Sequence, residues 1–230
     1  MRIDILSAIP ELMESAINNS IIKIAQEKGV AEIYLHNLHD YADNKFGHID
    51  DYPFGGGAGM LIMCEPIFKA IEKLQSQRKY DEVIFMAADG ERLDQSLCNK
   101  LSLSRSIIII AGHYKGIDQR IRDYLITKEI SIGDFVLSGG ELPALILTDA
   151  IVRLLPGVIS DLESALEDSY QNDLLEAPQY TRPREYKGLS VPEVLLSGNK
   201  AKIDEWKLNQ SIEKTKRLRP DLYQKYIDEQ

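Results

Sequence analysis

The 230 residues of this chain can bury a full hydrophobic core, and we expect one large domain with a small appendage. Its 44% hydrophobic and 27% charged residues are typical of a soluble globular protein, and no apolar run in the sequence reaches the roughly 18 residues that a membrane helix needs. Two distant cysteines and four histidines without metal-ligand spacing argue against a disulfide scaffold and a zinc site, and they favour a reduced, cytoplasmic protein.

The chain alternates strand-like and helix-like segments, which predicts an α/β fold with a parallel sheet flanked by helices. The strand-like segments share β-branched, apolar residues and are 2–7, 31–36, 82–88, 106–111 and 130–137. The helix-like segments share apolar periodicity and are 10–28, 65–78, 94–103, 117–125 and 141–155. Four consecutive isoleucines within 106–111 are typical of a central strand of such a sheet.

Two segments without this alternation divide the chain further. Residues 37–60 show little periodicity and contain a glycine-rich run, which indicates a loop with a functional role. Residues 160–176 contain six acidic residues and no basic one, which indicates a linker between domains. We therefore expect an α/β domain over 1–159, a linker over 160–176 and a small helical domain over 177–230.

The net charge of −9 argues against a nucleic-acid partner, but the charge is unevenly distributed. Residues 1–175 carry 16 basic and 27 acidic side chains, whereas residues 176–230 carry 11 and 9. Residues 199–219 alone hold seven basic residues against three acidic ones. Such a run is either a solvated helix face or a surface that contacts a polyanion.

Three turns follow the predicted strands that end at Ala88, Ala111 and Leu137. The carboxyl ends of parallel strands meet at one edge of a sheet, so we expect the turns to converge there, where ligands of such sheets bind. The last turn contains Gly139 and Gly140, and glycines at a strand-to-helix turn let a ligand approach free backbone N–H groups. For two glycines alone, a tight turn with a helix cap is the simpler interpretation.

Three charged residues near the end of the α/β domain have simple interpretations when each is taken alone. Asp149 and Arg153 are the internal charges of the predicted helix 141–155, which is otherwise apolar nearly all round, and their spacing fits an i, i+4 ion pair. Asp168 lies in the acidic linker and would be a solvated charge.

Taken together, these segments resemble the bacterial tRNA (guanine-N1)-methyltransferases, the TrmD-type enzymes of the SPOUT class. The motifs that carry the resemblance follow one another along most of the chain and are 51–60 (DYPFGGGAGM), 116–118 (GID), 131–143 (SIGDFVLSGGELP), 153–158 (RLLPGV), 167–169 (EDS), 178–183 (PQYTRP) and 194–199 (VLLSGN). One departure is Lys115, which stands where the family usually has a glutamate near the positively charged methyl donor.

The resemblance implies methyl transfer from S-adenosylmethionine to N1 of the guanine immediately 3′ of the tRNA anticodon. It implies a homodimer with sites shared between subunits, and an α/β domain whose C-terminal part forms a trefoil knot around the cofactor. It also implies that the small helical C-terminal domain binds tRNA, and that activity responds to Mg²⁺, although no carboxylate cluster in the sequence predicts a dedicated metal site.

By position, the resemblance assigns functional residues. Those that would contact S-adenosylmethionine are mostly small or apolar and are Met86, Ala87, Ala88, Gly112, Tyr114, Ile132, Gly133, Phe135, Leu137, Gly139 and Gly140. Asp168 matches the general base that accepts the N1 proton of guanine, and Arg153 matches the partner that stabilises the charge developing on O6. A carboxylate and a permanently charged guanidinium suit these two tasks.

Two alternatives stay open at this point. The first is a ribose 2′-O-methyltransferase of the same knotted class, although such enzymes typically lack the 167–169 motif and this tail. The second is a nucleotide- or RNA-binding module without catalysis, although no segment matches the phosphate-binding patterns G-x-x-x-x-G-K-[ST] or G-x-G-x-x-G.

Overall fold

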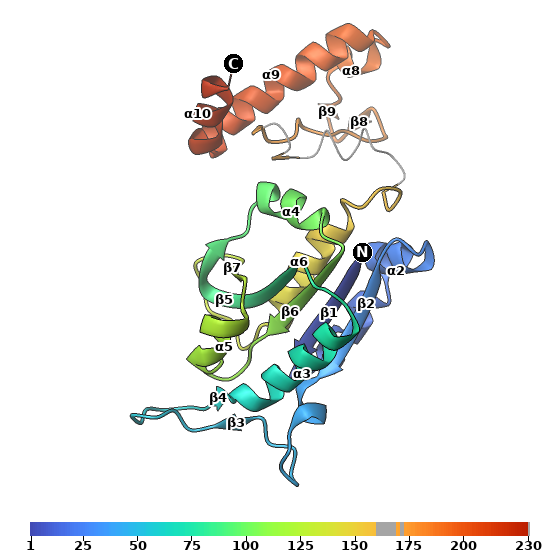
Figure 1. Ribbon diagram of the computed structural model, residues 1–230. Coiled ribbons are helices and arrows are strands. Elements are labelled where there is room, and N and C mark those ends of the chain that lie inside the picture. The colour runs from blue at the N-terminus through green and yellow to red at the C-terminus, as the bar shows by residue number, and fades with distance from the viewer. Residues whose placement is uncertain (160–168, 171–172, 230) are drawn as a thin grey trace. The chain divides into compact units, whose positions relative to one another are not determined.

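The computed structural model describes residues 1–159, 169–170 and 173–229, and the chain divides into two compact units, Met1–Ser160 and Asp161–Gln230. The N-terminal unit is built on one five-stranded sheet in the order β2-β1-β6-β5-β7, with every neighbouring pair parallel (Figure 1). Its strands are β1 (Arg2–Ser7), β2 (Glu32–Asn37), β5 (Glu82–Arg92), β6 (Ser106–Ala111) and β7 (Lys128–Ser131). The predicted parallel α/β fold is confirmed.

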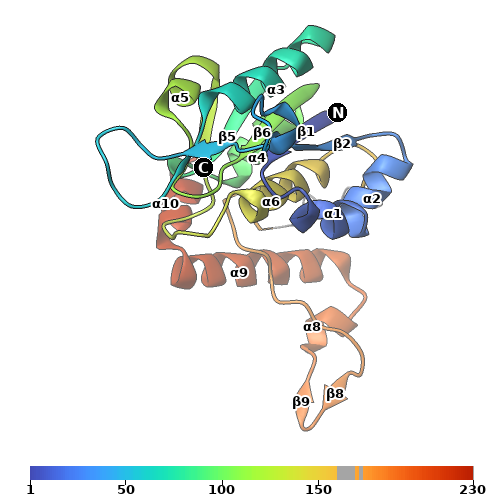
Figure 2. The ribbon, with the colours of Figure 1, turned by 90° about the horizontal axis from the view of Figure 1, so that it is seen from below.

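Helices cover both faces of this sheet (Figure 2). One face carries α1 (Glu11–Ile17), α2 (Ser20–Glu27), α4 (Gln95–Ser102) and α6 (Glu141–Val152), and the other carries α3 (Cys64–Gln77) and α5 (Gln119–Leu125). The isoleucines of β6 explain why this strand is central. Ile107 and Ile109 pack into one core and Ile108 and Ile110 into the other, because successive side chains of a strand point to opposite faces.

The prediction of a single helix over 10–28 is wrong, because two asparagines divide it. The Asn18 side chain donates to the carbonyl of Glu14, and the Asn19 side chain donates to the carbonyl of Ser15, at 2.8 and 2.7 Å. These bonds satisfy the last carbonyls of α1, and Ser20, the first residue of α2, has a φ of 53°, which one continuous helix could not contain in its interior. The chain therefore turns and restarts as α2.

The prediction of a strand over 130–137 is also wrong beyond its start, because β7 ends at Ser131. The Ser131 hydroxyl accepts a hydrogen bond from the Gly133 amide at 3.2 Å and donates one to the Gly133 carbonyl at 3.0 Å, which closes a turn. The following β-branched and aromatic residues leave the sheet, and Val136 is 86% exposed. Residues 132–139 are thus a loop at the edge of the sheet.

Residues 43–60 form an arm that projects from the N-terminal unit in Figure 1. The arm follows a short 3-10 helix, η1 (Leu38–Tyr41), and its two sides pair as β3 (Asp50–Asp51) and β4 (Leu61–Ile62). Three aromatic side chains on it, Phe46, Tyr52 and Phe54, are largely exposed, and Phe54 is fully exposed. The arm therefore presents apolar surface that nothing else in the described chain covers.

The C-terminal unit contains the predicted helices, and its elements are β8 (Glu185–Tyr186), β9 (Leu189–Ser190), α8 (Glu193–Leu196), α9 (Lys200–Leu218) and α10 (Pro220–Asp228). Thr215 of α9 is completely buried, and its hydroxyl accepts a hydrogen bond from the amide of Leu175 at 2.8 Å. This bond ties the start of the unit to its longest helix. Among the described residues, the structure contains no helix that is long and apolar enough to cross a membrane.

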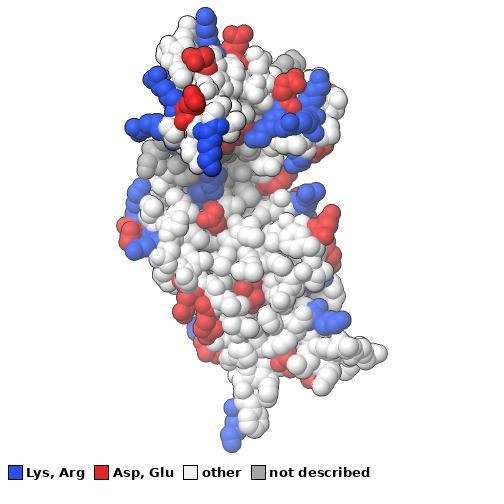
Figure 3. Space-filling view, turned by 180° about the vertical axis from the view of Figure 1, so that it is seen from behind, with Lys and Arg blue, Asp and Glu red and all other residues white. Residues whose placement is uncertain are grey.

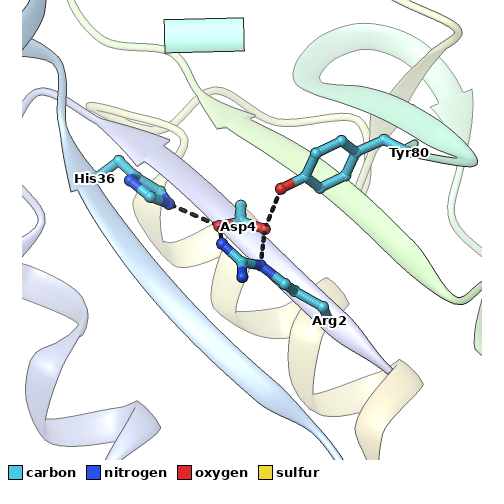
Figure 4. Close-up of polar contacts among 4 residues, drawn as sticks. All are labelled: Arg2, Asp4, His36 and Tyr80. Atoms are coloured by element: carbon cyan, nitrogen blue, oxygen red, sulfur yellow. Dashed lines mark hydrogen bonds and ion pairs between the residues drawn. The ribbon is translucent and has the colours of Figure 1, made fainter. Parts of the chain in front are cut away.

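A buried carboxylate stabilises the sheet on the face that α3 covers (Figure 4). The Asp4 side chain on β1 has no exposed surface, and it accepts hydrogen bonds from Arg2, His36 and Tyr80 at 2.7 to 2.9 Å. Burial alone would raise the pKa of this carboxyl group, but the hydrogen bonds outweigh burial and lower its pKa from 3.8 to about 2. The charged form is therefore the one that the fold stabilises.

We expect this cluster to make the protein sensitive to acid. Since the pKa of Asp4 is lower in the folded state, its contribution is fully present above pH 3.8 and is lost as the pH falls through about 2. The difference corresponds to about 2 kcal/mol. Urea unfolding between pH 6 and 2 measures it: the unfolding free energy of wild type should fall more steeply than that of Asp4→Asn. Parallel curves for the two proteins would contradict the prediction.

Candidate active site

A cavity of about 270 Å³ lies at the carboxyl edge of the sheet in the N-terminal unit. Its walls are the irregular stretch of β5 at Met86 to Asp89, the turns that follow β6 and β7, and the start of α6. The three segments that the sequence predicted to converge do so here, but the first is not a turn after Ala88, because β5 continues to Arg92, and the third begins at Ser131 and not at Leu137. All eleven residues expected to contact S-adenosylmethionine line this cavity, and Phe85, Ile130 and Pro143 add apolar surface.

Main-chain atoms bring two of these turns into direct contact. The Gly140 amide donates to the Gly112 carbonyl at 2.6 Å. A Cβ atom on Gly140 would lie 2.7 Å from the Gly112 nitrogen and 2.9 Å from the Cα of Ala111, which is closer than side chains approach backbone. Only glycine therefore fits at position 140, and the wall of the cavity here consists of backbone.

An arginine holds the irregular stretch of β5 in place. Arg122 of α5 pairs with Asp89 at 2.8 Å and forms a two-pronged ion pair with Glu129 of β7. The hydrogen bond from Arg122 holds the pKa of Asp89 below its usual value. Because Asp89 follows directly on three of the expected cofactor residues, Met86 to Ala88, this ion-pair cluster fixes the position of that part of the cavity wall.

The arm and the cavity share one edge. The amide of Lys115 donates to the carbonyl of Met60, and the amide of Ile62 donates to the carbonyl of Gly116, both at 3.0 Å. The Lys115 side chain lies over Gly59 and also lines the cavity. The cation that replaces the usual glutamate is thus placed between the arm and the cavity.

The two expected catalytic residues fall in different parts of the chain. Arg153 directly follows α6, where its amide donates to the carbonyl of Asp149 at 3.1 Å. Asp168 lies outside the described residues. Among the described residues, no group of three or more His, Cys, Asp or Glu could hold a metal ion.

The structure also brings residues to the cavity that the sequence did not single out. His113 and Arg122 line it, and Glu141 lies buried behind Gly139. The sequence offered one signal for Glu141, because an acidic residue directly after two glycines is well placed for the first turn of a helix. It offered none for Arg122, whose two partners lie 33 and 7 residues away.

Comparisons with known proteins agree on one family. Residues 1–225 match the family model for tRNA (Guanine-1)-methyltransferase TrmD. A tRNA (guanine-N(1)-)-methyltransferase of Bacteroides fragilis is 62% identical over 222 residues, which cover 96% of this chain and 99% of that relative. One of Flavobacterium johnsoniae is 57% identical over 226 residues, which cover 98% of this chain and all of that relative.

A solved structure supports the same assignment. The crystal structure of tRNA (m1G37) methyltransferase from Aquifex aeolicus superposes with a TM-score of 0.79 at 40% sequence identity, and the match covers 98% of this chain and 95% of that one. The family model, the near-complete coverage by relatives and the shared fold lead to one conclusion: this chain belongs to the TrmD family of tRNA (guanine-N1)-methyltransferases.

Proposed function

We propose that this protein transfers the methyl group of S-adenosylmethionine to N1 of the guanine immediately 3′ of the anticodon in tRNA, in the cytoplasm. The observation that carries the proposal is the cavity, since eleven residues from three separate segments surround one space at the edge of a parallel sheet where such folds bind ligands. The membership of the chain in the family supports the reaction, and the name of the Aquifex aeolicus protein includes the modified position.

The chemistry of the cavity walls suits S-adenosylmethionine. Glycines at positions 112, 139 and 140 leave main-chain N–H and C=O groups near its surface, and Met86, Ile132 and Leu137 supply apolar walls. Such a combination is typical of sites for a nucleoside, whose flat base needs apolar contact and whose edge needs hydrogen bonds. When bound, the cofactor supplies a methyl group on a sulfonium centre, so that no covalent enzyme intermediate is needed.

The chemistry of guanine assigns roles to two residues of the chain. N1 carries a proton and is a poor nucleophile until that proton leaves, and Asp168 is the carboxylate that we propose accepts it. As N1 loses its proton, negative charge spreads onto O6, where the guanidinium of Arg153 would stabilise it. Residues around Asp168 are also acidic, and like charges close in space would raise the pKa of its carboxyl group toward that of a useful base.

Single-turnover methyl transfer tests the proposal directly. The substrates are two versions of one tRNA, with guanine or adenine immediately 3′ of the anticodon, and the cofactor carries a labelled methyl group. We expect label only on the guanine version, at N1. Label on both versions would favour the ribose 2′-O-methyltransferase, and cofactor binding without transfer would favour the module without catalysis.

The C-terminal unit is the part that we propose binds the tRNA backbone. In Figure 3 its surface carries many Lys and Arg side chains, whereas much of the N-terminal unit in that view is uncharged. On α9, Lys200, Lys202 and Arg217 are exposed. The rings of Tyr180 and Trp206 lie 6.4 Å apart, and such aromatic side chains can stack on unpaired bases.

Neutralising part of this charge is expected to weaken tRNA binding. The double variant Lys200→Gln, Lys202→Gln removes two cations that could each neutralise one phosphate. The slope of log affinity against log salt concentration should therefore decrease by about one unit for each such phosphate. Filter binding between 50 and 300 mM KCl measures this slope, and calorimetry measures cofactor affinity, which should not change. An unaltered slope would show that these lysines do not bind the tRNA backbone.

We also propose that the protein is a homodimer with cavities shared between subunits. Apolar side chains that a monomer would leave in water support this, because Leu142 and Ile146 of α6 are 57% and 47% exposed and Val136 beside the cavity is 86% exposed. Val136 lies on the cavity rim, and Leu142 and Ile146 lie on α6, whose start forms part of the cavity wall. Sedimentation equilibrium of the purified protein tests the proposal, and a monomer at micromolar concentration would contradict it.

A further inference from the structure

A buried glutamate connects the first strand of the sheet to the cavity. Glu141 begins α6 and is 2% exposed. Its Oε1 accepts a hydrogen bond from the Ser7 hydroxyl at 2.8 Å, and this hydroxyl in turn accepts one from the amide of Ile9 at 2.9 Å. Ser7 is the last residue of β1 and is fully buried. The sheet therefore holds Oε1 of Glu141 in place, and Oε2 is the carboxylate oxygen that is left for another partner.

The second oxygen faces a histidine across a gap. Oε2 of Glu141 lies 3.6 Å from Nδ1 of His113, which is too long for a hydrogen bond. The Nδ1 atom is buried and has no hydrogen-bond partner among the described residues. An unpaired polar atom in this position is unfavourable, because it has lost its hydrogen bonds to water and gained none in the protein. A movement of about half an ångström would bring the two atoms within bonding distance and would remove that cost.

The backbone of Gly139 packs against both side chains of this pair. A Cβ atom at position 139 would lie 2.3 Å from Oε2 of Glu141 and 2.6 Å from Nδ1 of His113. Both side chains thus pack directly against the Gly139 backbone. Gly139 and His113 themselves line the cavity, on the two turns that the hydrogen bond between Gly140 and Gly112 already joins. A ligand that contacts both turns and brings them closer together would therefore shorten the distance between Nδ1 of His113 and Oε2 of Glu141.

We propose that His113 and Glu141 form a clasp between the two turns, and that its hydrogen bond closes when S-adenosylmethionine occupies the cavity. The proposal rests on the proposed function, because it takes the cavity as the cofactor site. In the closed clasp, Nδ1–H of His113 donates to Oε2 of Glu141. Both residues are positioning residues: the free energy of the closed clasp contributes to cofactor affinity, and neither side chain takes part in methyl transfer.

Cofactor affinity of four variants, measured by calorimetry on the full chain, tests the clasp. His113→Ala and Glu141→Ala should each raise the Kd for S-adenosylmethionine about tenfold, the effect of one hydrogen bond of ordinary strength. His113→Asn should restore most of the affinity, because its amide nitrogen can replace Nδ1. The double variant His113→Ala, Glu141→Ala should bind no more weakly than either single variant, because both remove the same bond.

Two further measurements separate a clasp from a general loss of stability. The steady-state KM for the cofactor should rise while kcat at saturating cofactor stays near wild type. Asp4→Asn, which removes another buried carboxylate on the opposite face of the sheet (Figure 4), should lower stability without changing the cofactor Kd. If Glu141→Ala does not fold, the comparison of His113→Ala with His113→Asn remains decisive, because the His113 side chain is already 22% exposed.

The outcomes distinguish the two proposals. Failure of the wild-type chain to bind S-adenosylmethionine would overturn the proposed function itself. Binding by wild type together with unchanged affinity in His113→Ala would overturn the clasp alone. Equal loss of affinity in His113→Ala and His113→Asn would also overturn it, since the hydrogen bond would then not be the source of the effect.

Discussion

Replacing Asp168 with asparagine is expected to lower the single-turnover rate of methyl transfer by about 10²- to 10⁴-fold, the usual contribution of a general base. Asparagine has nearly the same size but cannot accept the N1 proton of guanine at neutral pH. The Kd for S-adenosylmethionine should stay near the wild-type value, because the change removes the proposed base and leaves the cofactor cavity intact. Rapid-quench measurement of transfer to a guanine-containing tRNA, with calorimetry for the cofactor, gives both quantities.

Glu167→Gln provides the matched control for this change. It removes one negative charge from the same acidic segment, one residue away, and leaves the proposed base intact. A similar loss of rate in both variants would show that the charge of the segment matters and not one carboxylate. Full activity of Asp168→Asn would remove Asp168 from the mechanism.

The second large effect is expected from a single methyl group at position 140. In Gly140→Ala the new Cβ would lie within 3.0 Å of three backbone atoms of Ala111 and Gly112, none of which can move without moving β6 or its turn. Overpacking of this kind costs about 1–3 kcal/mol, and here the displaced atoms are the cavity wall. We therefore expect both a lower unfolding free energy and at least about a tenfold weaker Kd for S-adenosylmethionine.

Gly157→Ala separates these two effects. Gly157 has a φ of 81°, so alanine is strained there, but a Cβ at this position meets no atom within 4 Å and is not part of the cavity lining. Chemical denaturation should show destabilisation of both variants, whereas weak cofactor binding should occur only in Gly140→Ala. Normal cofactor affinity in Gly140→Ala would mean that the wall adapts without loss of function.

The sequence predicted the sheet well because its central strands, β1 and β6, are buried on both faces. A strand such as β6 must be apolar at every position, and four adjacent isoleucines leave few alternatives. The same criterion failed at residues 132–137, which are β-branched and aromatic because they line a cavity and its rim. Composition alone does not distinguish residues that face another strand from residues that face a ligand.

The hydrogen-bonded clusters around Asp4 and Glu141 could not be predicted from the sequence, and the reason is different. Asp4 and Tyr80 are 76 residues apart, and Ser7 and Glu141 are 134 apart, so no local spacing relates them. Each looks like an ordinary surface residue until the fold buries it. The eleven residues around the cavity were assigned by position through the resemblance to a known family, and not because their spacing revealed a common site. Their role in cofactor binding, like the roles of Asp168 and Arg153, stays a prediction.

The backbone wall between Gly112 and Gly140 has a consequence for inhibition. A compound that binds to the main-chain groups of these turns would contact atoms that every amino acid shares, and Gly140 cannot be exchanged without the steric damage described above. Resistance by point mutation would then carry a fitness penalty. A compound that relies on the exposed side chains of Lys115 or Val136 would meet no such barrier, because a single codon change there leaves the wall intact.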